Sequence, residues 1–409
     1  MKYKLFFAGI LFWALSCGEK PIPEVTMQDD VRILASDSLM GRETGTEGAD
    51  LAAAYLEGRM QDLKLKPFDA DGDYLQVFSF RPRKDPHSQV EFGSASDSSL
   101  TGKNLLGYID NGGSRTVILG AHYDHLGLGG DGSLHAGDPA IHNGADDNAS
   151  GVAVLLQLAK RIQEWPEARD NYLIMLFSGE EMGLLGSNYF AKNPTLDLEA
   201  VPYMINLDMV GRLNGEKTLS ISGTGTTPIW PQLLNSLNPG FNLVLRESGV
   251  GPSDHTSFYL QDIPVLHFFT GQHEDYHKPS DDAERLNYEG MEQIATYLFE
   301  LVRAMEDQKE VAFRKTKNES EETPRFTVAM GVMPDYLFSG KGMRIDGVTE
   351  GRPAAAAGLQ KGDVVVQLGD STIVDMMSYM RALSAFKAGD STTVVVAREG
   401  DTISTGIRF

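Results

Sequence analysis

The chain has 409 residues, of which 41% are hydrophobic and 23% are charged, an ordinary globular composition that excludes a disordered or collagen-like protein. Acidic residues outnumber basic ones by 57 to 36 and give a formal net charge of −21, so phosphate backbones would repel the chain and we expect no nucleic-acid binding. The single cysteine, Cys17, excludes an intramolecular disulfide and a cysteine-rich zinc site. Any metal must therefore be held by His, Asp, Glu or water.

The first twenty residues have the pattern of a targeting segment. Lys2 and Lys4 precede an apolar run over residues 5–15, which is too short to span a bilayer, and small or apolar residues lead directly to Cys17. This pattern resembles a bacterial lipoprotein signal, whose cysteine becomes lipidated after cleavage. A plain cleaved signal peptide or a buried helix is the alternative. The resemblance implies an exported protein of the periplasm or cell envelope, with residues 1–17 as the signal, residues 18–27 as a tether, and membrane contact only through the lipid.

Residues 28–308 alternate between helical and strand patterns. Thr46 is placed to cap a first helix and Ser150 a second. On the first helix, the apolar positions expected to share one stripe are Leu51, Ala54, Tyr55 and Leu63. Four short runs are almost entirely apolar, as expected for strands buried on both faces: 117–121, 172–177, 203–207 and 263–269. Such runs, separated by helices, predict an α/β domain with helices on both faces of one sheet.

Side chains that can bind metals follow these four runs closely. Sites in α/β proteins collect at the carboxyl ends of the strands, and eight of the nine histidines lie between His122 and His277. The polar groups concerned are His122 with Asp124, Asp146 with Asp147, Glu180 with Glu181, Asp208 alone, and Tyr276 with His277. These groups are the candidates for a metal site.

Each group also has an ordinary interpretation. His122 as a ligand whose ring is oriented by Asp124 competes with a solvated turn. Asp147 as a bridge between cations competes with a helix cap, although Ser150 is better placed for capping. In the Glu180–Glu181 pair, one carboxylate can bind metal while the other acts as general base on a water, but an isolated pair is commonly a charged turn. The order and spacing of the groups carry more weight than any one of them.

The order His–Asp–Glu-Glu–Asp–His strongly resembles the dizinc aminopeptidases of the zinc-exopeptidase fold, of the aminopeptidase Y and leucyl aminopeptidase type. The glycine-rich segment GRETGTEG at residues 41–48, with the helix after it, resembles the N-terminal helix of that family. The resemblance covers roughly residues 28–305. It implies a three-layer α/β/α domain with a mostly parallel central sheet.

The same resemblance implies a dinuclear zinc site with a general base beside it. Asp147 would bridge the two ions, and the register relative to Ser150 and Gly151 picks Asp147 over Asp146. The other implied roles are His122 and Asp208 as ligands of one ion, Glu181 and His277 as ligands of the other, Glu180 as general base, Asp124 as the residue that orients His122, and Tyr276 as a donor to the tetrahedral intermediate. This set of oxygen and nitrogen ligands would also accept Mn2+ or Co2+.

The C-terminal part has a different pattern. Residues 309–325 are polar and charged, which predicts a linker. Residues 326–409 resemble a bacterial PDZ domain through Gly347-Val348, the segment 353–358, Leu359 and Gly362-Asp363-Val364. Such a domain can bind an extended peptide or a protein C-terminus by adding it as a strand, and Gly331, Val332 and Met333 are expected in its binding loop. The alternative is a module that only packs against the catalytic domain.

The expected function is an exported metal-dependent aminopeptidase that acts on peptides with a free amino terminus. Three alternatives stay open: a glutaminyl cyclase-like enzyme with one zinc, a carboxypeptidase, and a non-catalytic peptide-binding protein. The full ligand set, including His122 and the bridging Asp147, favours hydrolysis over cyclisation. A decayed site should lack at least one ligand or the base, and every one of them is present.

Overall fold

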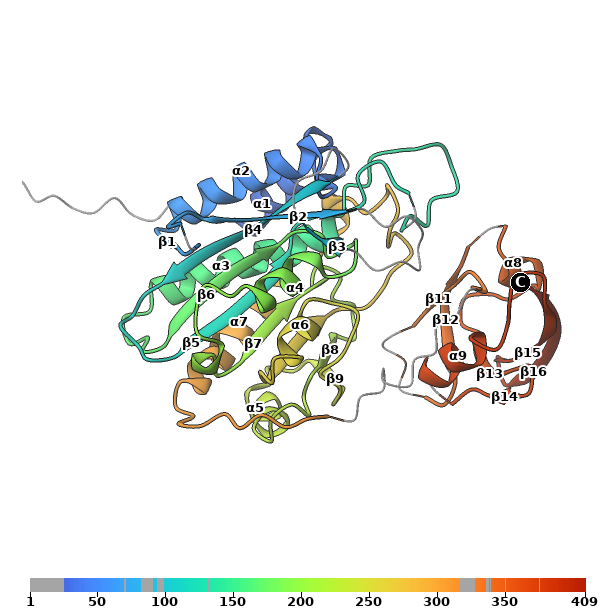
Figure 1. Cartoon of the computed structure of the whole chain (residues 1–409). Coiled ribbons are helices and arrows are strands. Elements are labelled where there is room, and N and C mark those ends of the chain that lie inside the picture. Colours follow the sequence, from blue (N-terminus) through green and yellow to red (C-terminus); the bar gives the residue numbers. More distant parts are fainter. Residues whose placement is uncertain are drawn as a thin grey trace, which may run out of the picture.

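The computed structural model describes residues 26–69, 71–81, 91–93, 99–130, 132–316, 328–335, 338, 340–349, 351–374 and 376–409. The predicted signal with Cys17, nearly all of the predicted tether, and residues 317–325 of the predicted linker lie outside these ranges. Figure 1 shows two bodies, a larger one built around a long twisted sheet and a smaller C-terminal one. In the described part of the chain, no helix is both long and apolar enough to cross a membrane.

The large sheet has ten strands in the order β3-β2-β4-β6-β5-β7-β10-β8-β9, with β1 paired to β4. Their bounds are β1 Lys66–Pro67, β2 Leu75–Arg81, β3 Glu91–Phe92, β4 Leu100–Ile109, β5 Thr116–His122, β6 Asn171–Phe177, β7 Met204–Leu207, β8 Thr218–Ser222, β9 Asn242–Leu245 and β10 Val265–Phe269. The four central strands β6, β5, β7 and β10 run parallel, and antiparallel pairs join them to β4 and β8. The four apolar runs predicted as strands are these central four. The expected α/β fold with a mostly parallel centre is confirmed.

Side chains on the central strands alternate between two cores. On β6, Ile174 packs into the core under one set of helices, and its neighbour Met175 packs into the core on the opposite face. The first face is covered by α1, α2, α3, α5 and α7, and the second by α4 and α6. The helix bounds are α1 Met27–Leu34, α2 Glu47–Asp62, α3 Gly151–Gln163, α4 Leu185–Lys192, α5 Trp230–Leu237, α6 His255–Tyr259 and α7 Tyr288–Met305. Short turns of helix lie at η1 Asp37–Arg42, η2 Ala145–Ser150, η3 Leu198–Ala200 and η4 Ala283–Arg285.

Helix α2 packs only partly through the predicted stripe, since Leu63 is buried and Tyr55 is half-buried against the same core, but the other two positions are not. Leu51 is 43% exposed and Ala54 is also exposed, whereas Ala52, Ala53 and Leu56 are buried. Small alanines let the helix lie close to the sheet, and this contact outweighs the larger apolar area that Leu51 could have buried. Thr46 stands at the N-cap, but its hydroxyl donates to the Glu43 carbonyl at 2.6 Å and does not cap the helix.

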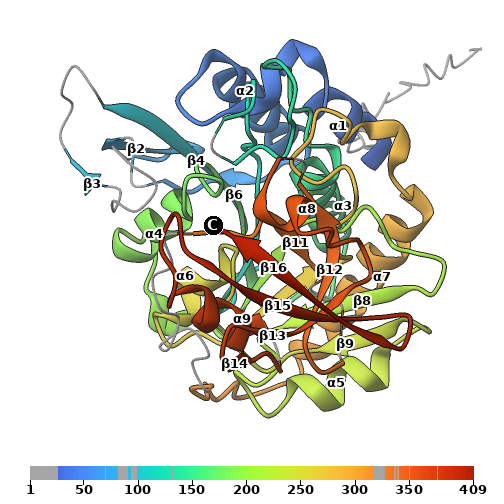
Figure 2. The ribbon, with the colours of Figure 1, turned by 90° about the vertical axis from the view of Figure 1, so that its right-hand side faces the viewer.

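The smaller body is a sheet in the order β11-β12-β13-β15-β16, with β14 paired to β13. The bounds are β11 Val332–Pro334, β12 Met343–Val348, β13 Val364–Leu368, β14 Ser371–Thr372, β15 Ser391–Arg398 and β16 Asp401–Arg408, with helices α8 Pro353–Ala356 and α9 Met376–Leu383. Its own apolar core includes Met330, Ile345 and Val394. The antiparallel strands with two short helices agree with the expected PDZ-like domain. Figures 1 and 2 place β11 and β12 on the side that faces the larger body.

Asp363 forms a buried ion pair inside this small domain. Its carboxylate accepts from Arg398 Nε at 2.6 Å and Nη2 at 2.8 Å, and from the Gln360 N–H at 2.9 Å. Burial acts to raise the pKa of Asp363, but Arg398 and the Gln360 N–H outweigh burial and lower it. A lowered pKa stabilises the fold above the unfolded value of about 4, and this stabilisation is lost as the pH falls through the folded pKa.

We therefore expect Asp363→Asn to lower the melting temperature of the C-terminal domain at pH 7 and to have a smaller effect near pH 3. Differential scanning calorimetry of the whole protein at both pH values checks this. Asp370→Asn, an exposed aspartate of the same domain, is the control and should be neutral. A loss of the same size at both pH values would contradict the ion-pair explanation.

Candidate active site

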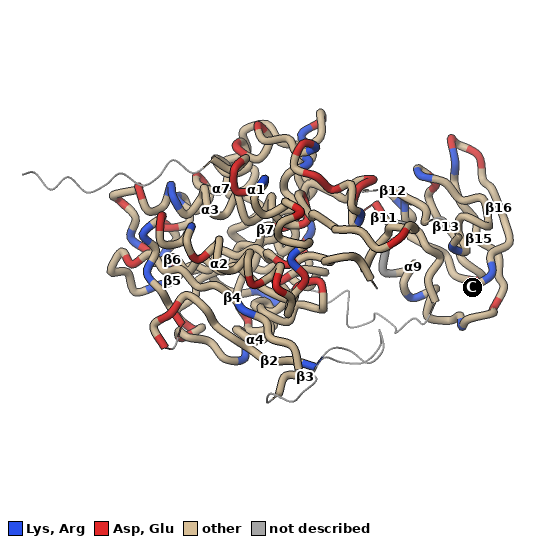
Figure 3. The backbone as a smooth tube through the Cα atoms, turned by 90° about the horizontal axis from the view of Figure 1, so that it is seen from above, with Lys and Arg blue, Asp and Glu red and all other residues tan. Residues whose placement is uncertain are grey.

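The carboxyl ends of β5, β6, β7 and β10 meet at one edge of the large sheet. His122 is the last residue of β5, Glu180 and Glu181 follow shortly after β6, and Asp208 comes directly after β7. His277 lies in the loop that follows β10. Because these strands are parallel, their ends bring the side chains to one place. Figure 3 shows acidic positions gathered in the loops between the large sheet and the small domain.

Asp147 reaches the site from the turn η2, ahead of α3. The Asp281 carboxylate fixes this turn by accepting the N–H of Asp146 at 2.8 Å and of Asp147 at 3.1 Å. Asn148 Oδ1 accepts from the Gly151 N–H at 3.0 Å, and its amide donates to the Leu207 carbonyl at 2.9 Å. The backbone on both sides of Asp147 is therefore held in place.

The expectation that Ser150 caps α3 is wrong. Its hydroxyl donates toward Asp146, at 2.8 Å from the carbonyl and 2.9 Å from Oδ1, and accepts from the Val210 N–H at 3.0 Å. Asn148 caps the start of α3 instead, because its side-chain oxygen accepts a hydrogen bond from the Gly151 N–H. Ser150 serves to tie the turn to the loop after β7.

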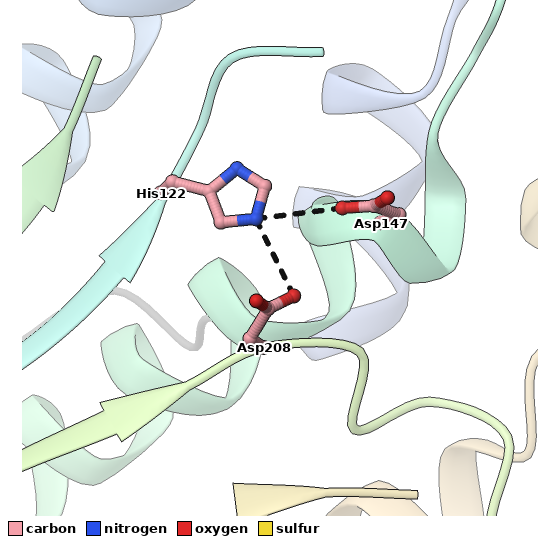
Figure 4. A group of neighbouring side chains, drawn as sticks. All are labelled: His122, Asp147 and Asp208. Carbon is pink, nitrogen blue, oxygen red and sulfur yellow. Dashed lines mark hydrogen bonds and ion pairs between the residues drawn. The ribbon is translucent and has the colours of Figure 1, made fainter. Parts of the chain in front are cut away.

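A first cluster joins His122, Asp147 and Asp208 (Figure 4). His122 Nε2 lies 3.4 Å from Asp147 Oδ1 and 3.3 Å from Asp208 Oδ1. One ligand atom from each residue lies within 4.8 Å of the others. A buried imidazole and two carboxylates at this spacing form a donor set suited to a divalent cation.

A second cluster forms around Glu181 on the other side of Asp147. His277 Nε2 lies 3.1 Å from Asp147 Oδ2 and 3.3 Å from Glu181 Oε2. His125 Nδ1 lies 2.8 Å from Glu181 Oε1 and 4.0 Å from Asp147 Oδ2. His125, Asp147 and Glu181 also place one ligand atom each within 4.8 Å. The two oxygens of Asp147 thus face different clusters.

Asp146 is turned away from both clusters. Its Oδ1 accepts from the Gly211 N–H at 2.7 Å and from Ser150, and its Oδ2 lies 3.2 Å from His273 Nε2. The structure therefore brings Asp147, and not Asp146, into the group with the predicted histidines.

His125 is a site residue that the sequence did not single out. Only its ring contact with Glu181, 56 residues further along the chain, reveals it. His125 is buried and does not line the cavity at the site, whereas His277 does. The signal in the sequence was its place in the run His122-Tyr123-Asp124-His125, three residues after the first expected ligand.

The adjacent carboxylates Glu180 and Glu181 are driven in opposite directions by their surroundings. Burial raises the pKa of Glu180 well above the usual carboxyl range, although His122 opposes this rise. Burial also acts on Glu181, but His277 and His125 outweigh it and hold the pKa of Glu181 well below its usual value. A pair of carboxyl groups with separated pKa values is typical of a site that assigns different roles to the two.

Neighbouring charged groups also shift the pKa values of His277 and Asp208. Although burial acts to lower it, the pKa of His277 is raised to about 11 by Glu181 and Asp147. Burial acts to raise the pKa of Asp208, yet the nearby His122 lowers it to about 2. The carboxylates of the site therefore stabilise positive charge between them, as expected for residues that hold cations.

Asp124 lies beside His122 and Glu180, and Tyr276 lies beside His277. The Asp124 carboxylate is 3.7 Å from His122 Nδ1, whose nearer neighbour is the Asp124 carbonyl at 3.3 Å, and it accepts the Glu180 N–H at 3.1 Å. It therefore connects the predicted ligand to the predicted base. The ring of Tyr276 stacks on His277 with centroids 3.8 Å apart and lines the cavity.

A buried arginine ties the loops of the site together. Arg42 donates to the carbonyls of Tyr123 at 2.8 Å, Asn143 at 2.7 Å, Gly144 at 3.0 Å, and also to Leu34. Burial lowers its pKa to about 10, against the opposing effect of Asp124 and other carboxylates, so it stays charged at neutral pH. The sequence marked this segment only through its resemblance to the family, because contacts over a hundred residues away are invisible in a local pattern.

A cavity of about 130 Å³ opens onto the clusters. Its lining includes the predicted base and all of the predicted ligands except His122. The described residues that line it are Asp147, Glu180, Glu181, Asp208, Met209, Ser220, Ser222, Arg246, Pro252, His267, Phe269, Gln272, Tyr276 and His277. A substrate could reach both clusters from this cavity.

The residues expected in the PDZ binding loop lie at the edge of the small sheet. Val332 and Met333 belong to β11, which among the described residues pairs with β12 alone. Gly331 precedes them with φ +75°, a conformation that favours glycine, and its carbonyl accepts from the Thr349 N–H at 2.9 Å. In the part of the chain that the structure describes, no strand pairs with the other side of β11.

Comparisons with known proteins identify both domains. Residues 104–302 match the profile of peptidase family M28, and residues 311–408 match the PDZ domain. The larger domain is an M28 metallopeptidase domain. Aminopeptidase YwaD of Bacillus subtilis is 28% identical over 43% of this chain and 38% of its own length. The "Probable lipoprotein aminopeptidase LpqL" of Mycobacterium tuberculosis is 26% identical over 47% of this chain and 38% of its own length. The matches thus span well under half of these two relatives.

Solved structures share the fold of the M28 domain. The zinc aminopeptidase BSAP of Bacillus subtilis superposes with a TM-score of 0.54 at 17% identity, over 73% of this chain and 100% of that one. The glutaminyl cyclase of Porphyromonas gingivalis has a TM-score of 0.54 at 18% identity, over 68% of this chain and 97% of that one. At these identities the likeness concerns the fold alone, and it is equal for the aminopeptidase and the cyclase.

Proposed function

We propose that this protein is a metal-dependent aminopeptidase that removes N-terminal residues from peptides with a dinuclear zinc site. The observation that carries the proposal is the position of Asp147, whose Oδ1 faces His122 and Asp208 while its Oδ2 faces His277. A carboxylate shared in this way can serve two cations at once.

The ligands divide between two ions. His122 and Asp208 would hold one ion, Glu181 and His277 the other, and Asp147 both. We assign His277 rather than His125 to the second ion because His277 faces the substrate cavity. His125, enclosed against Glu181, would orient that carboxylate. Three protein ligands for each ion leave room for water and substrate, as catalytic sites require.

Bound zinc would supply a Lewis acid for the scissile carbonyl and lower the pKa of a nearby water. Glu180, whose pKa is raised by burial, accepts the proton of the attacking water and delivers it to the leaving amine. Asp124 holds the Glu180 backbone and lies beside His122, so it positions both. Tyr276 lines the cavity and would donate to the developing oxyanion. The free amino group of the substrate would bind at this acidic end of the cavity, which favours exopeptidase action.

The C-terminal PDZ domain would bind an extended peptide or a protein C-terminus. The free side of β11, with Gly331, Val332 and Met333, is the edge to which such a peptide would add. A cavity lined by residues 134–136, 274 and 278 of the M28 domain and by residues 346–349 and 361 of the PDZ domain lies between the two. The open edge favours binding over a purely packing role.

We also propose that the protein is exported and lipid-anchored through Cys17. The support is the signal-like sequence and the relative whose printed name includes "lipoprotein". The anchor would leave the catalytic domain in the periplasm or cell envelope.

Activity and metal content of one purified sample lacking residues 1–17 test the proposed function. Leucyl and other aminoacyl anilides would be assayed before and after chelation, with elemental analysis alongside. We expect about two metal equivalents, and cleavage that chelation abolishes and zinc restores. One equivalent would support the cyclase alternative, and no metal would support a non-catalytic peptide-binding protein. Two equivalents without cleavage of substrates that carry a free amino group would indicate an enzyme that acts on N-terminally blocked peptides or at peptide C-termini.

A further inference from the structure

Strand β8 contributes polar side chains to the wall of the cavity. Strand β8 reads Thr-Leu-Ser-Ile-Ser, and its residues alternate between the two faces of the sheet. Leu219 and Ile221 are buried in the apolar core under the helices, whereas Ser220 and Ser222 line the cavity. A pocket for an aliphatic side chain would be expected to place apolar residues at these two positions.

Arg246 stands on the same face of the sheet. Strands β8 and β9 are parallel with Ile221 opposite Leu245, and the Arg246 N–H continues the ladder by donating to the Ile221 carbonyl at 2.9 Å. This register places Arg246 beside Ser222, and both line the cavity. Among the lining residues that the structure describes, Arg246 is the single lysine or arginine.

The cavity lining therefore includes two groups of residues of different character. One group belongs to the proposed metal site and comprises the carboxylates Asp147, Glu180, Glu181 and Asp208. The other combines the Arg246 guanidinium with Ser220, Ser222 and the Gln272 amide. A substrate carboxylate matches the second group, because a guanidinium and hydroxyl groups can donate hydrogen bonds to its oxygens.

We propose that Arg246 selects peptides whose N-terminal residue is glutamate or aspartate. This inference rests on the proposed aminopeptidase function and specifies its substrate class. The α-amino group and the scissile carbonyl would both bind at the metal site. The side-chain carboxylate would bind Arg246 across the same cavity. A site that binds a substrate carboxylate through a guanidinium and hydroxyl groups discriminates against substrates without one, since the charge-assisted hydrogen bonds to that carboxylate are then not formed.

The carboxylate that binds Arg246 could also be the C-terminal α-carboxylate of a peptide, if the enzyme cleaved peptides from the C-terminus. The first residue's side chain is favoured because relatives that match this chain are named as aminopeptidases. The experiment separates the two sources by using substrates that carry only one of them.

The test compares kcat/KM for glutamyl, glutaminyl and leucyl anilides on the zinc-loaded protein, with an N-acetylated dipeptide as the carboxypeptidase substrate. Glutaminyl anilide has nearly the shape of the glutamyl compound but no charge. We expect the glutamyl substrate to be preferred over the glutaminyl one by at least about 10-fold, as for a charge-assisted hydrogen bond. Arg246→Met should lower kcat/KM for the glutamyl substrate by about 10- to 100-fold and change the other two by less than about 3-fold.

Arg303→Met, at an exposed arginine of α7, is the matched control and should leave kcat/KM unchanged for every substrate. Melting temperature and metal content of Arg246→Met should equal those of the parent, which shows that the variant is folded. Cleavage of leucyl anilide without a glutamyl preference would overturn the inference and leave the aminopeptidase function standing. Loss of N-acetyl dipeptide cleavage on Arg246→Met, with no aminoacyl anilide cleaved, would overturn both and assign Arg246 to a C-terminal carboxylate.

Discussion

Glu180→Gln should retain its bound metal and lose about 10²- to 10⁴-fold in kcat, the contribution typical of a general base. The reason lies in the environment of the two adjacent carboxylates. Glu181 is held ionised by His277 and His125, as a ligand must be, whereas burial makes Glu180 ready to accept a proton. The amide has almost the same shape but cannot take the proton of a water.

Steady-state kinetics and elemental analysis on the same samples check this prediction. Glu199→Gln, an exposed glutamate in η3, is the control and should retain full activity and metal. Glu181→Gln should differ from both, because it removes a ligand and should lower metal content as well as rate. Retention of most activity by Glu180→Gln would show that another group removes the proton.

The sequence could predict the centre of the fold because each central strand carries its own signal. Runs such as 172–177 are apolar throughout, and only a strand buried on both faces needs that pattern. The end of each run then located a polar residue at the carboxyl edge of the sheet. Parallel strands bring such ends together, so most of the proposed ligands could be found without any knowledge of tertiary contacts.

What the sequence could not predict depends on contacts between distant segments. His125 belongs to the site because its ring contacts Glu181, and Arg42 because it donates to the carbonyls of Asn143 and Gly144. Arg246 lies next to Ser222 because of the pairing of β8 with β9. The predictions that Ser150 caps α3 and that Leu51 is buried were wrong for a related reason. Tertiary contacts outweigh the local preference of a residue and the apolar pattern of a single helix.

The metal content of three aspartate variants should separate the dinuclear site from a mononuclear one. Asp147→Asn should lose most of both metal equivalents and lower kcat/KM by at least about 10³-fold, because each oxygen of Asp147 faces a different cluster. Asp208→Asn affects only the cluster with His122 and should leave close to one equivalent. An amide oxygen is a weaker ligand than a carboxylate, so these changes act on the metal with little change of shape.

Asp146→Asn is the matched control for Asp147→Asn, since the two residues are adjacent and both are buried. Asp146 is bonded to Gly211 and Ser150, so its variant should keep two equivalents even if it melts at a lower temperature. Elemental analysis after gel filtration measures all three. If the parent bound one equivalent and Asp147→Asn and Asp208→Asn each abolished it, Asp147 would serve a single ion. The shared fold with glutaminyl cyclase would then carry more weight than the likeness to aminopeptidases, because the bridging role of Asp147 is what distinguishes the two proposals.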